Sequence, residues 1–287
     1  MSCCDWQLGI AFSAVSKPGE RRSQEAVKQL NLPDRIYHLA EAPNWPLIQR
    51  DGLLCANRLV DAASLDTASR KRLQLEQRMV HTVLPNGVRI RDQRPMPPAA
   101  LEKCLCGMSP TDWYAIVNAR VFFWIDPDRL NRQRAACSSR PQVVIAVDTA
   151  ALVAAHHEHV ALTPINTGNA RRKPARRGAA TFVPYAQWTR SGWASEAAAL
   201  DTPLRKHSHQ PVELTVVDAV SDIMRFVVDV VALPAGQALV TNATGAAIVS
   251  TVVDASADLA RVNRLAARRE YNRATKKGTK PVTSGEQ

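Results

Sequence analysis

Residues 33–54 read PDRIYHLAEAPNWPLIQRDGLL, and this stretch decides the fold class of the chain. The segment Arg35–Leu39 places branched and aromatic residues around one histidine, a composition that predicts a short strand. The segment Trp45–Arg50 predicts a helix, and Gly52 ends it, as a glycine just beyond a helix commonly does. A strand that passes so soon into a helix indicates a domain that mixes both kinds of element.

The histidine inside this strand, His38, has two readings. Successive side chains of a strand point to opposite faces, so Tyr37 and His38 meet different surroundings. One reading is a core histidine whose ring nitrogens are satisfied inside the protein. The other is a histidine that faces a ligand, and the strand alone does not decide between them.

Short strands and helices follow one another irregularly along the rest of the chain, which favours an α+β fold over a doubly wound parallel sheet. The turn Pro85–Gly87 predicts a small hairpin with residues 81–84 and 88–91 as its strands. Residues 164–193, rich in Gly, Pro and Arg, predict a long irregular loop of the kind that is more often functional than idle. Helices are predicted over 62–79, 99–106, 110–119, 129–136 and 150–157, and strands over 121–125, 142–147 and 212–217.

A length of 287 residues fits one large domain with appendages. We expect an N-terminal lead-in over residues 1–32, a main domain over 33–232 and a C-terminal extension over 233–287. The extension holds a predicted basic helix, Ala255–Lys277, and a polar tail.

The chain carries 37 Lys and Arg against 26 Asp and Glu, a formal charge of +11, and two segments hold much of the excess. Arg171–Arg177 contains five cations in seven residues, and Arg261–Lys280 contains eight cations beside one carboxylate. Such patches gather polyanions through long-range attraction and counterion release. A solvated face or a basic tail without a ligand is the alternative reading.

Composition and motifs exclude several classes of protein. No run of about 18 apolar residues occurs and the N-terminus lacks the layout of a secretory signal, so we expect a cytoplasmic protein without a membrane span. The six cysteines include no pair of Cys-x-x-Cys units, so we expect reduced thiols and no metal site. Neither of the two standard glycine-rich phosphate cradles is present.

Four motifs occur in one order: IYHLAEAPNWPLIQRDGLL at 36–54, VRIRDQR at 88–94, RVFFW at 120–124 and QPVELTV at 210–216. Their order and spacing resemble those of the ADP-ribosyltransferases, nearest to the DarT-type enzymes that modify DNA. They also resemble a group of bacterial proteins of unassigned function. The resemblance covers roughly residues 33–230 and implies an α+β catalytic domain with an ADP-ribosyltransferase-like split β-sheet core and peripheral helices.

This resemblance implies NAD as cosubstrate, cleaved at its nicotinamide–ribose bond through an oxocarbenium-like transition state. The catalytic residues that it implies are Glu213, Arg91 and His38. Glu213 would stabilise the positive charge that develops on the ribose, and His38 would bind a ribose hydroxyl or the nicotinamide amide. A solvent-facing strand glutamate is the alternative reading of Glu213.

Two wider sets of residues follow from the same resemblance. Arg91 and Arg94 suit the pyrophosphate of NAD, and Arg89 competes with Arg91 because strand alternation puts both on one face. The NAD-binding set comprises Tyr37, His38, Gly52, Arg91, Arg94, Phe123 and Trp124, although aromatic residues in a strand are more often plain core. The nucleic-acid-binding set comprises Asn166, Thr167, Arg171, Arg172, Lys173, Arg176 and Arg177, with Trp188 and Trp193 nearby to stack on bases.

The resulting hypothesis is an NAD-dependent ADP-ribosyltransferase that modifies DNA or RNA, acting as a toxin or phage-defence effector with an antitoxin as a possible partner. Three alternatives stay open. They are a transferase that acts on protein, an NAD glycohydrolase that passes ADP-ribose to water, and a basic nucleic-acid-binding module without catalysis. The sequence leaves the oligomeric state open.

Overall fold

A computed structural model describes residues 31–137, 139–206, 208–242 and 245. The expected lead-in therefore lies almost wholly outside the described residues. The predicted basic helix Ala255–Lys277 and the cation-rich segment Arg261–Lys280 lie outside them as well. All fold statements below concern the described part of the chain.

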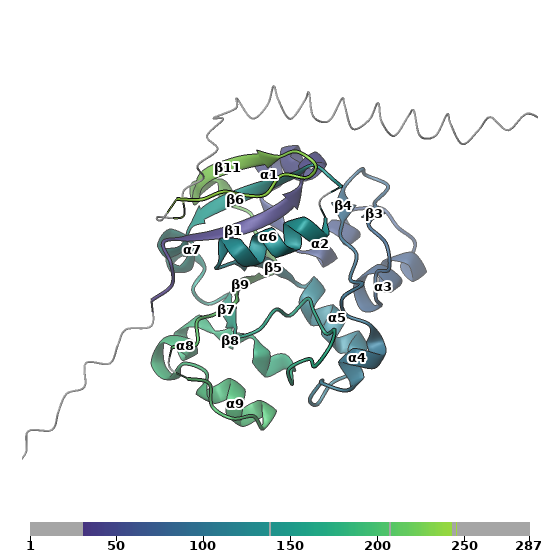
Figure 1. Ribbon diagram of the computed structural model, residues 1–287. Coiled ribbons are helices and arrows are strands. Elements are labelled where there is room, and N and C mark those ends of the chain that lie inside the picture. The colour runs from purple at the N-terminus through teal and green to yellow at the C-terminus, as the bar shows by residue number, and fades with distance from the viewer. Residues whose placement is uncertain (1–30, 138, 207, 243–244, 246–287) are drawn as a thin grey trace, which may run out of the picture. The chain divides into compact units, whose positions relative to one another are not determined.

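A seven-stranded antiparallel sheet forms the centre of the protein, in the order β11-β6-β1-β5-β9-β7-β8 (Figure 1). Two short pairs, β2 with β10 and β3 with β4, accompany it. The strands of the sheet are β1 (Arg35–Glu41), β5 (Arg120–Trp124), β6 (Gln142–Asp148), β7 (Val160–Thr163), β8 (Val183–Pro184), β9 (Glu213–Val217) and β11 (Val227–Leu233). The short pairs are β2 (Leu53–Leu54) with β10 (Ala219–Val220) and β3 (Thr82–Val83) with β4 (Arg89–Ile90).

Helices pack against the sheet, and the fold is α+β as the sequence predicts. Leu130 of α6 packs against Tyr37 and Leu39 of β1, so α6 covers one half of the sheet. Trp113 of α5 belongs to the cluster that covers Phe122 of β5 in the other half. The helices are α1 (Trp45–Asp51), α2 (Ala56–Asp61), α3 (Thr67–Leu75), α4 (Pro98–Glu102), α5 (Pro110–Asn118), α6 (Pro127–Ala136), α7 (Thr149–His156), α8 (Tyr185–Ser191) and α9 (Ala194–Leu200), with short 3-10 turns η1 (Ala42–Asn44), η2 (Ala179–Thr181) and η3 (Ile223–Arg225).

Helix starts in this chain have local causes. Ser109 and Asp112 form a capping box at the start of α5, and Pro110 occupies the first turn, where a missing N–H costs nothing. Asp66 accepts a hydrogen bond from Ser69 N at 2.9 Å and so begins α3 separately from α2. The helix predicted over 62–79 is present but shorter, because this cap begins it at Thr67 and it ends at Leu75.

The predicted irregular loop over 164–193 is also wrong in its second half, because η2, β8 and α8 lie within it. The sequence did not predict β7, α9 or β11 either. The hairpin around Pro85–Gly87 is confirmed, with Thr82 opposite Ile90 and Val83 opposite Arg89.

The sheet is weakly paired between β1 and β5. β1 pairs with β6 from Arg35 to Glu41, but it pairs with β5 only at Tyr37 opposite Trp124. This single pair joins a three-stranded half, β11-β6-β1, to a four-stranded half, β5-β9-β7-β8. We call it the β1–β5 junction.

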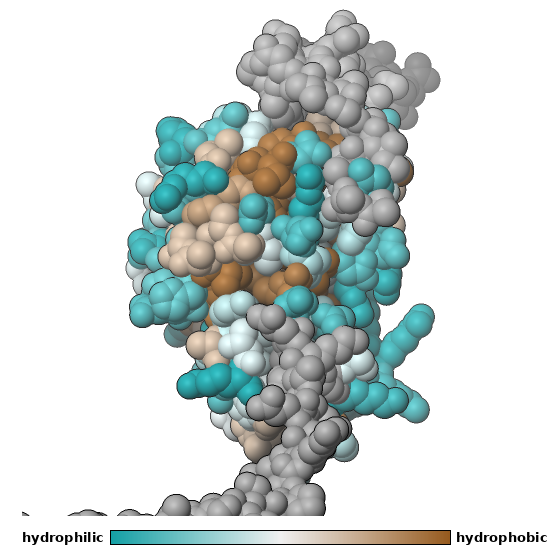
Figure 2. All heavy atoms as spheres, turned by 90° about the vertical axis from the view of Figure 1, so that its left-hand side faces the viewer, coloured by the Kyte–Doolittle hydropathy of each residue, from teal (hydrophilic) through white to brown (hydrophobic). Residues whose placement is uncertain are grey.

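The surface is mixed in character. On the side of the molecule that carries α7 and α8, apolar side chains lie among polar ones (Figure 2). Met224 and Val228 are examples of large apolar residues left 44% and 46% exposed, as happens on most protein surfaces. Within the described residues, no helix is both long enough and apolar enough to cross a bilayer.

Gly52 ends α1 as predicted, with a φ of 82° in the region that favours glycine. A Cβ at this position would lie 2.4 Å from Ser221 Cα and 2.5 Å from the Val220 carbonyl oxygen. Gly87, in the hairpin turn, has a φ of 83°, but no atom of the described residues lies within 4 Å of its Cβ position. The two glycines therefore share backbone strain and differ in steric room.

We predict that Gly52→Ala lowers the free energy of unfolding by about 3 kcal/mol or more, because it adds a backbone clash to the strain of a positive φ. Gly87→Ala, which carries the strain alone, is expected to lower it by about 1 kcal/mol. Urea unfolding followed by circular dichroism measures both variants. Equal losses would contradict the steric argument.

Candidate active site

Glu213, the first residue of β9, is buried, with only 4% of its surface exposed. Its Oε2 accepts hydrogen bonds from Thr163 Oγ1 at 3.0 Å, Thr167 Oγ1 at 2.9 Å and Thr167 N at 3.2 Å. Thr163 lies opposite Glu213 on β7, and Thr167 lies on the loop that follows that strand. The reading of Glu213 as a solvent-facing strand residue is therefore wrong.

The environment of Glu213 tunes its proton affinity. Burial raises the pKa of its carboxyl group to about 7, and this desolvation outweighs the threonine hydrogen bonds and the charge of Arg177, which lower the pKa. No hydrogen bond of the described residues occupies Oε1, so the carboxyl group is anchored through Oε2 alone. A carboxyl group poised near neutral pH suits acid–base or electrostatic catalysis.

Arg177 is held inside the protein, unlike the exposed cations earlier in its segment. It is 2% exposed, its guanidinium lies 5.7 Å from the Trp113 ring centre, and its Nη1 donates to the Thr167 carbonyl oxygen at 3.3 Å. Thr167 is likewise buried, with its hydroxyl bound to Glu213. Thr167 and Arg177, which the sequence predicts to bind nucleic acid, are therefore buried and instead anchor the loop that holds Glu213.

His38 is anchored inside the protein through one ring nitrogen. Its Nδ1 lies 2.8 Å from the Phe122 carbonyl oxygen, which only accepts, so Nδ1 carries the proton and Nε2 of the neutral ring is an acceptor. Burial lowers the pKa of His38 to about 4; the charge of Arg91 acts in the same direction and the bond to Phe122 against it. Among the described residues, no hydrogen bond uses Nε2, so the ring is anchored through Nδ1 alone.

Arg91 approaches the same end of β1. Its Nη2 donates to the Leu39 carbonyl oxygen at 3.1 Å, and its Nε lies 3.5 Å from Glu41 Oε1. Glu41 is buried and also binds Arg140 Nε at 3.1 Å and Gln142 Nε2 at 3.0 Å. Two guanidinium groups thus share one carboxylate, which leaves positive charge beside His38.

The other two arginines considered for the pyrophosphate lie differently. Arg94 is exposed, and its carbonyl oxygen accepts a hydrogen bond from Arg171 Nη2 at 3.3 Å. The backbone N–H and carbonyl of Arg89 bind the Asn44 side chain at 2.9 and 2.8 Å, which fixes β4 beside η1.

The structure places the predicted residues of β1, β5 and β9 near the β1–β5 junction but on opposite faces of the sheet. Tyr37 pairs with Trp124, which pairs with Glu213, so these three side chains occupy neighbouring positions on one face. By alternation His38 lies on the other face, where its ring packs edge-on against Phe123 with ring centres 5.8 Å apart. Among the described residues, no hydrogen bond or ion pair joins His38 to Glu213.

The aromatic residues of the expected NAD-binding set also hold the fold together. Tyr37 is 3% exposed and donates its hydroxyl hydrogen to the Gly245 carbonyl oxygen at 2.7 Å. Trp124 donates from Nε1 to Gln133 Oε1 at 2.6 Å and is only partly buried, whereas Phe123 is fully buried. Trp124 is thus the aromatic residue of this set with the most surface left for a ligand.

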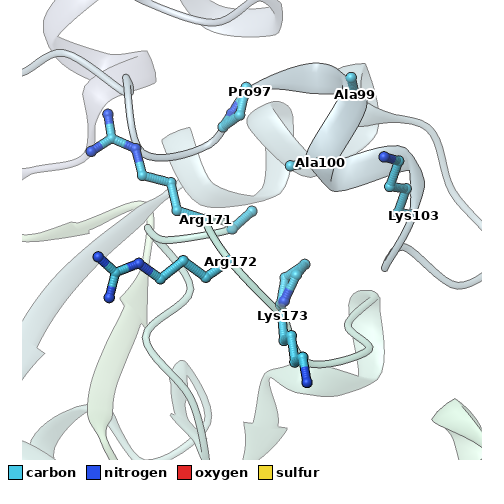
Figure 3. A pocket seen from close by; sticks show the side chains of 9 residues that line it. Pro97, Ala99, Ala100, Lys103, Arg171, Arg172 and Lys173 are labelled. Atoms are coloured by element: carbon cyan, nitrogen blue, oxygen red, sulfur yellow. The ribbon is translucent and has the colours of Figure 1, made fainter.

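A pocket of about 540 Å³ lies between α4 and the loop after β7 (Figure 3). Trp188 and Trp193 are 0% and 3% exposed, so they belong to the core and do not stack on bases as expected. Asn166 is half-buried near Thr167, and Arg176 is exposed. The pocket is lined by Pro97, Ala99, Ala100, Lys103, Ala170, Arg171, Arg172, Lys173 and Pro174.

Sequence reasoning missed several residues of this region. Glu41 and Arg140 meet only because β1 and β6 pair, and Lys103 reaches the pocket only because α4 packs beside the loop. No local pattern marks any of them. Cys55, Cys104, Cys106 and Cys137 are free thiols, and the described residues hold no group of three or more side chains suited to a metal ion.

Comparison with known proteins gives one match. A family model described as "Family of unknown function (DUF7002)" matches residues 34–227, from the start of β1 to the first residue of β11. The matched region includes His38, Arg91, Glu213 and the whole pocket. No curated protein and no solved structure matches the chain.

The raised pKa of Glu213 predicts a pH-dependent stability difference between the wild type and Glu213→Gln. Between its ordinary value of 4.5 and its folded value of about 7, the unfolded chain has lost the proton and the folded chain keeps it. The free energy of unfolding of the wild type therefore falls relative to the variant as pH rises through this window, by at most about 3 kcal/mol.

Chemical denaturation of both proteins across this pH range measures the difference. His38, whose pKa is lowered, adds stability as pH rises from about 4 to 6.5, but this contribution is common to both proteins and cancels. Parallel stability profiles would show that burial does not perturb the glutamate.

Proposed function

The chain belongs to the DUF7002 family of proteins of unknown function, and from this premise we propose that it is an NAD-dependent ADP-ribosyltransferase that acts on nucleic acid. The observation that carries the proposal is the setting of Glu213. Its carboxyl group is buried, anchored through Oε2 by two threonines, left with a free Oε1, and has a pKa raised to about 7. A fixed carboxylate of this kind suits a reaction in which positive charge develops on a sugar.

The proposed reaction breaks the bond between the ribose C1′ and the nicotinamide nitrogen, and the bonding electrons leave with nicotinamide. The ionised Glu213 stabilises the positive charge on the ribose and accepts a hydrogen bond from a ribose hydroxyl through Oε1. The acceptor then forms its bond to C1′ and loses its proton, for which the same carboxylate is a base of suitable pKa.

His38 and Arg91 would hold NAD beside the β1–β5 junction, with His38 on the face of the sheet opposite to Glu213. The free Nε2 of the neutral His38 ring is an acceptor for a ribose hydroxyl or for the amide hydrogens of nicotinamide. Arg91 shares Glu41 with Arg140, so it can turn to the pyrophosphate without leaving that carboxylate unpaired.

The fold is compatible with this assignment. The single residue pair between β1 and β5 divides the sheet into two halves, which supports the split core that the resemblance implies. The exposed cations Arg171, Arg172, Lys173 and Arg176 support a polyanionic acceptor. A role as a toxin or phage-defence effector, and an antitoxin partner, follow from the resemblance alone.

We predict that Glu213→Gln keeps most of the affinity for NAD but lowers the rate of transfer about 100-fold or more, because the negative charge is needed mainly in the transition state. Nicotinamide release and labelling of DNA, RNA or protein from labelled NAD measure the rate. Wild-type activity should fall below about pH 7 as the carboxyl group takes up its proton.

The matched control is Glu158→Gln, which changes a glutamate side chain that is 79% exposed and should retain full activity. Wild-type turnover in Glu213→Gln would show that the catalytic carboxylate lies elsewhere. Nicotinamide release without a labelled acceptor would favour an NAD glycohydrolase, a labelled protein would favour the protein transferase, and binding of nucleic acid without any NAD turnover would favour the non-catalytic module.

For Arg91→Ala we expect the KM for NAD to rise about tenfold or more with a smaller change in kcat, since a pyrophosphate contact acts in the ground state and the transition state alike. Arg140 and Gln142 still hold Glu41 in this variant, so the fold should persist. Steady-state kinetics on Arg91→Ala, Arg89→Ala and Arg94→Ala compare the three candidates. An unchanged KM for Arg91→Ala would assign the pyrophosphate to whichever of the other two raises it.

A further inference from the structure

The pocket between α4 and the loop after β7 has fixed walls. Ala170 N donates to the Pro95 carbonyl oxygen at 2.8 Å, which ties the loop to the chain that enters α4. At the far end of the loop, Arg177 N donates to the Cys104 carbonyl oxygen and Cys106 N to the Arg177 carbonyl oxygen, both at 2.8 Å. The exposed segment 171–176 therefore spans two fastened points, and the pocket beside it is already formed.

The charge at this pocket has one sign. Four of its lining residues are cations, and none is acidic. The side chains of Arg171 and Arg172 extend to the same side of the loop, away from Lys103, which follows the last residue of α4 (Figure 3). Among the described residues, no ion pair engages these cations, and the nearest acidic neighbour in sequence, Glu102, is exposed beside Lys103.

The surface between these cations is made by small apolar side chains. Pro97, Ala99 and Ala100 come from the start of α4, and Ala170 and Pro174 come from the loop. An apolar surface with cations on both sides suits a ligand that alternates flat apolar groups with negative charges. Guanidinium forks match phosphate oxygens in geometry as well as in charge.

We propose that this pocket binds the sugar–phosphate backbone of a nucleic acid, with Lys103, which follows α4, on one side of the pocket and Arg171, Arg172 and Lys173 of the loop on the other. Lys103 and the α4 side of the pocket are absent from the binding set that the sequence predicts. The inference deepens the proposed function by giving the acceptor a binding surface. It rests on the proposed function only in identifying the bound nucleic acid as the acceptor of the reaction.

The position of the pocket explains how a bound strand relates to Glu213. Thr167, which anchors the Glu213 carboxyl group, precedes Arg171 in the same loop, and Arg177 beyond the cations closes back onto Thr167. The loop is thus held at both ends by backbone hydrogen bonds. Its exposed cations point outward, and Thr167, which binds Glu213, lies inside. A strand held by the pocket lies against the element that positions the carboxylate.

The test compares two triple variants that remove the same number and kind of charges. Lys103→Gln, Arg171→Gln and Arg172→Gln alter the pocket; Lys71→Gln, Arg72→Gln and Arg132→Gln alter exposed cations of α3 and α6. Glutamine keeps a long polar side chain, and at Arg172, where φ is 56°, it adds no backbone strain beyond that of the arginine. Fluorescence anisotropy with a labelled mixed-sequence oligonucleotide, offered as single- and double-stranded DNA and RNA without NAD, gives affinity against salt concentration.

We expect the pocket variant to reduce the slope of log affinity against log salt by about 2 to 3 units, since each phosphate left without its cation lowers the slope by roughly 0.7 to 0.9. The control should change the slope by less than about one unit. Equal effects of the two variants, or wild-type binding by the pocket variant, would overturn the proposal. Tighter binding of polyglutamate or of phosphatidylserine vesicles than of the oligonucleotide, abolished in the pocket variant, would also overturn it in favour of another polyanion.

The assay separates this inference from the proposed reaction because it contains no NAD. Pocket-dependent binding by a protein that never releases nicotinamide would uphold the pocket and reject the transferase. Nicotinamide release by a protein whose nucleic-acid binding is unchanged in the pocket variant would uphold the transferase and reject the pocket. Circular dichroism spectra and thermal unfolding of both triple variants show whether each is folded before its binding is read.

Discussion

The pair Tyr37–Trp124 is the constraint on which the arrangement of this protein depends, because no other backbone pair of the described strands joins β1 to β5. Side-chain hydrogen bonds take the place of the missing ladder. His38 Nδ1 reaches the Phe122 carbonyl oxygen across the junction, and Trp124 Nε1 reaches Gln133 of α6. Residues implied in NAD binding therefore also keep the two halves of the sheet together. This dual use explains why polar groups occur in strands whose other residues are core.

Burying a glutamate destabilises its ionised form, and the surroundings of Glu213 show which groups offset this effect. Burial alone disfavours the carboxylate, while Thr163, Thr167 and the nearby charge of Arg177 restore part of its stability. Arg177 is itself buried and bonded to the carbonyl oxygens of Thr167 and Ala175, so the loop and the glutamate depend on each other. Groups arranged to keep a titratable side chain away from water, when packing apolar residues would be simpler, are typical of functional sites.

Sequence patterns predicted the parts of the fold that local chemistry determines, such as the α1 stop at Gly52 and the hairpin turn at Pro85–Gly87. β7 and β11 were missed because both are short apolar runs without the alternation that marks a half-buried strand. The same distinction between local sequence and distant contacts applies to the candidate site. Glu213 and His38 were selected through a resemblance, but their burial, anchoring partners and tautomer arise from contacts between distant segments. Charge counting placed Arg177 on the surface, although packing draws it inside, because a run of cations reveals nothing about which side chains a loop turns inward.

The two titratable groups at the junction are shifted in opposite directions, and this sets their roles. Burial lowers the pKa of His38 to about 4 and raises that of Glu213 to about 7, because desolvation favours the neutral form of each. Between these values both groups are mostly uncharged, and above about pH 7 only the glutamate acquires charge. His38 is thus a constant hydrogen-bond acceptor through Nε2 over the physiological range, whereas Glu213 supplies the charge that changes with pH. In the proposed reaction the carboxylate can stabilise a sugar cation only when it is ionised, whereas the hydrogen bonding of His38, on the opposite face of the sheet, stays the same across this range.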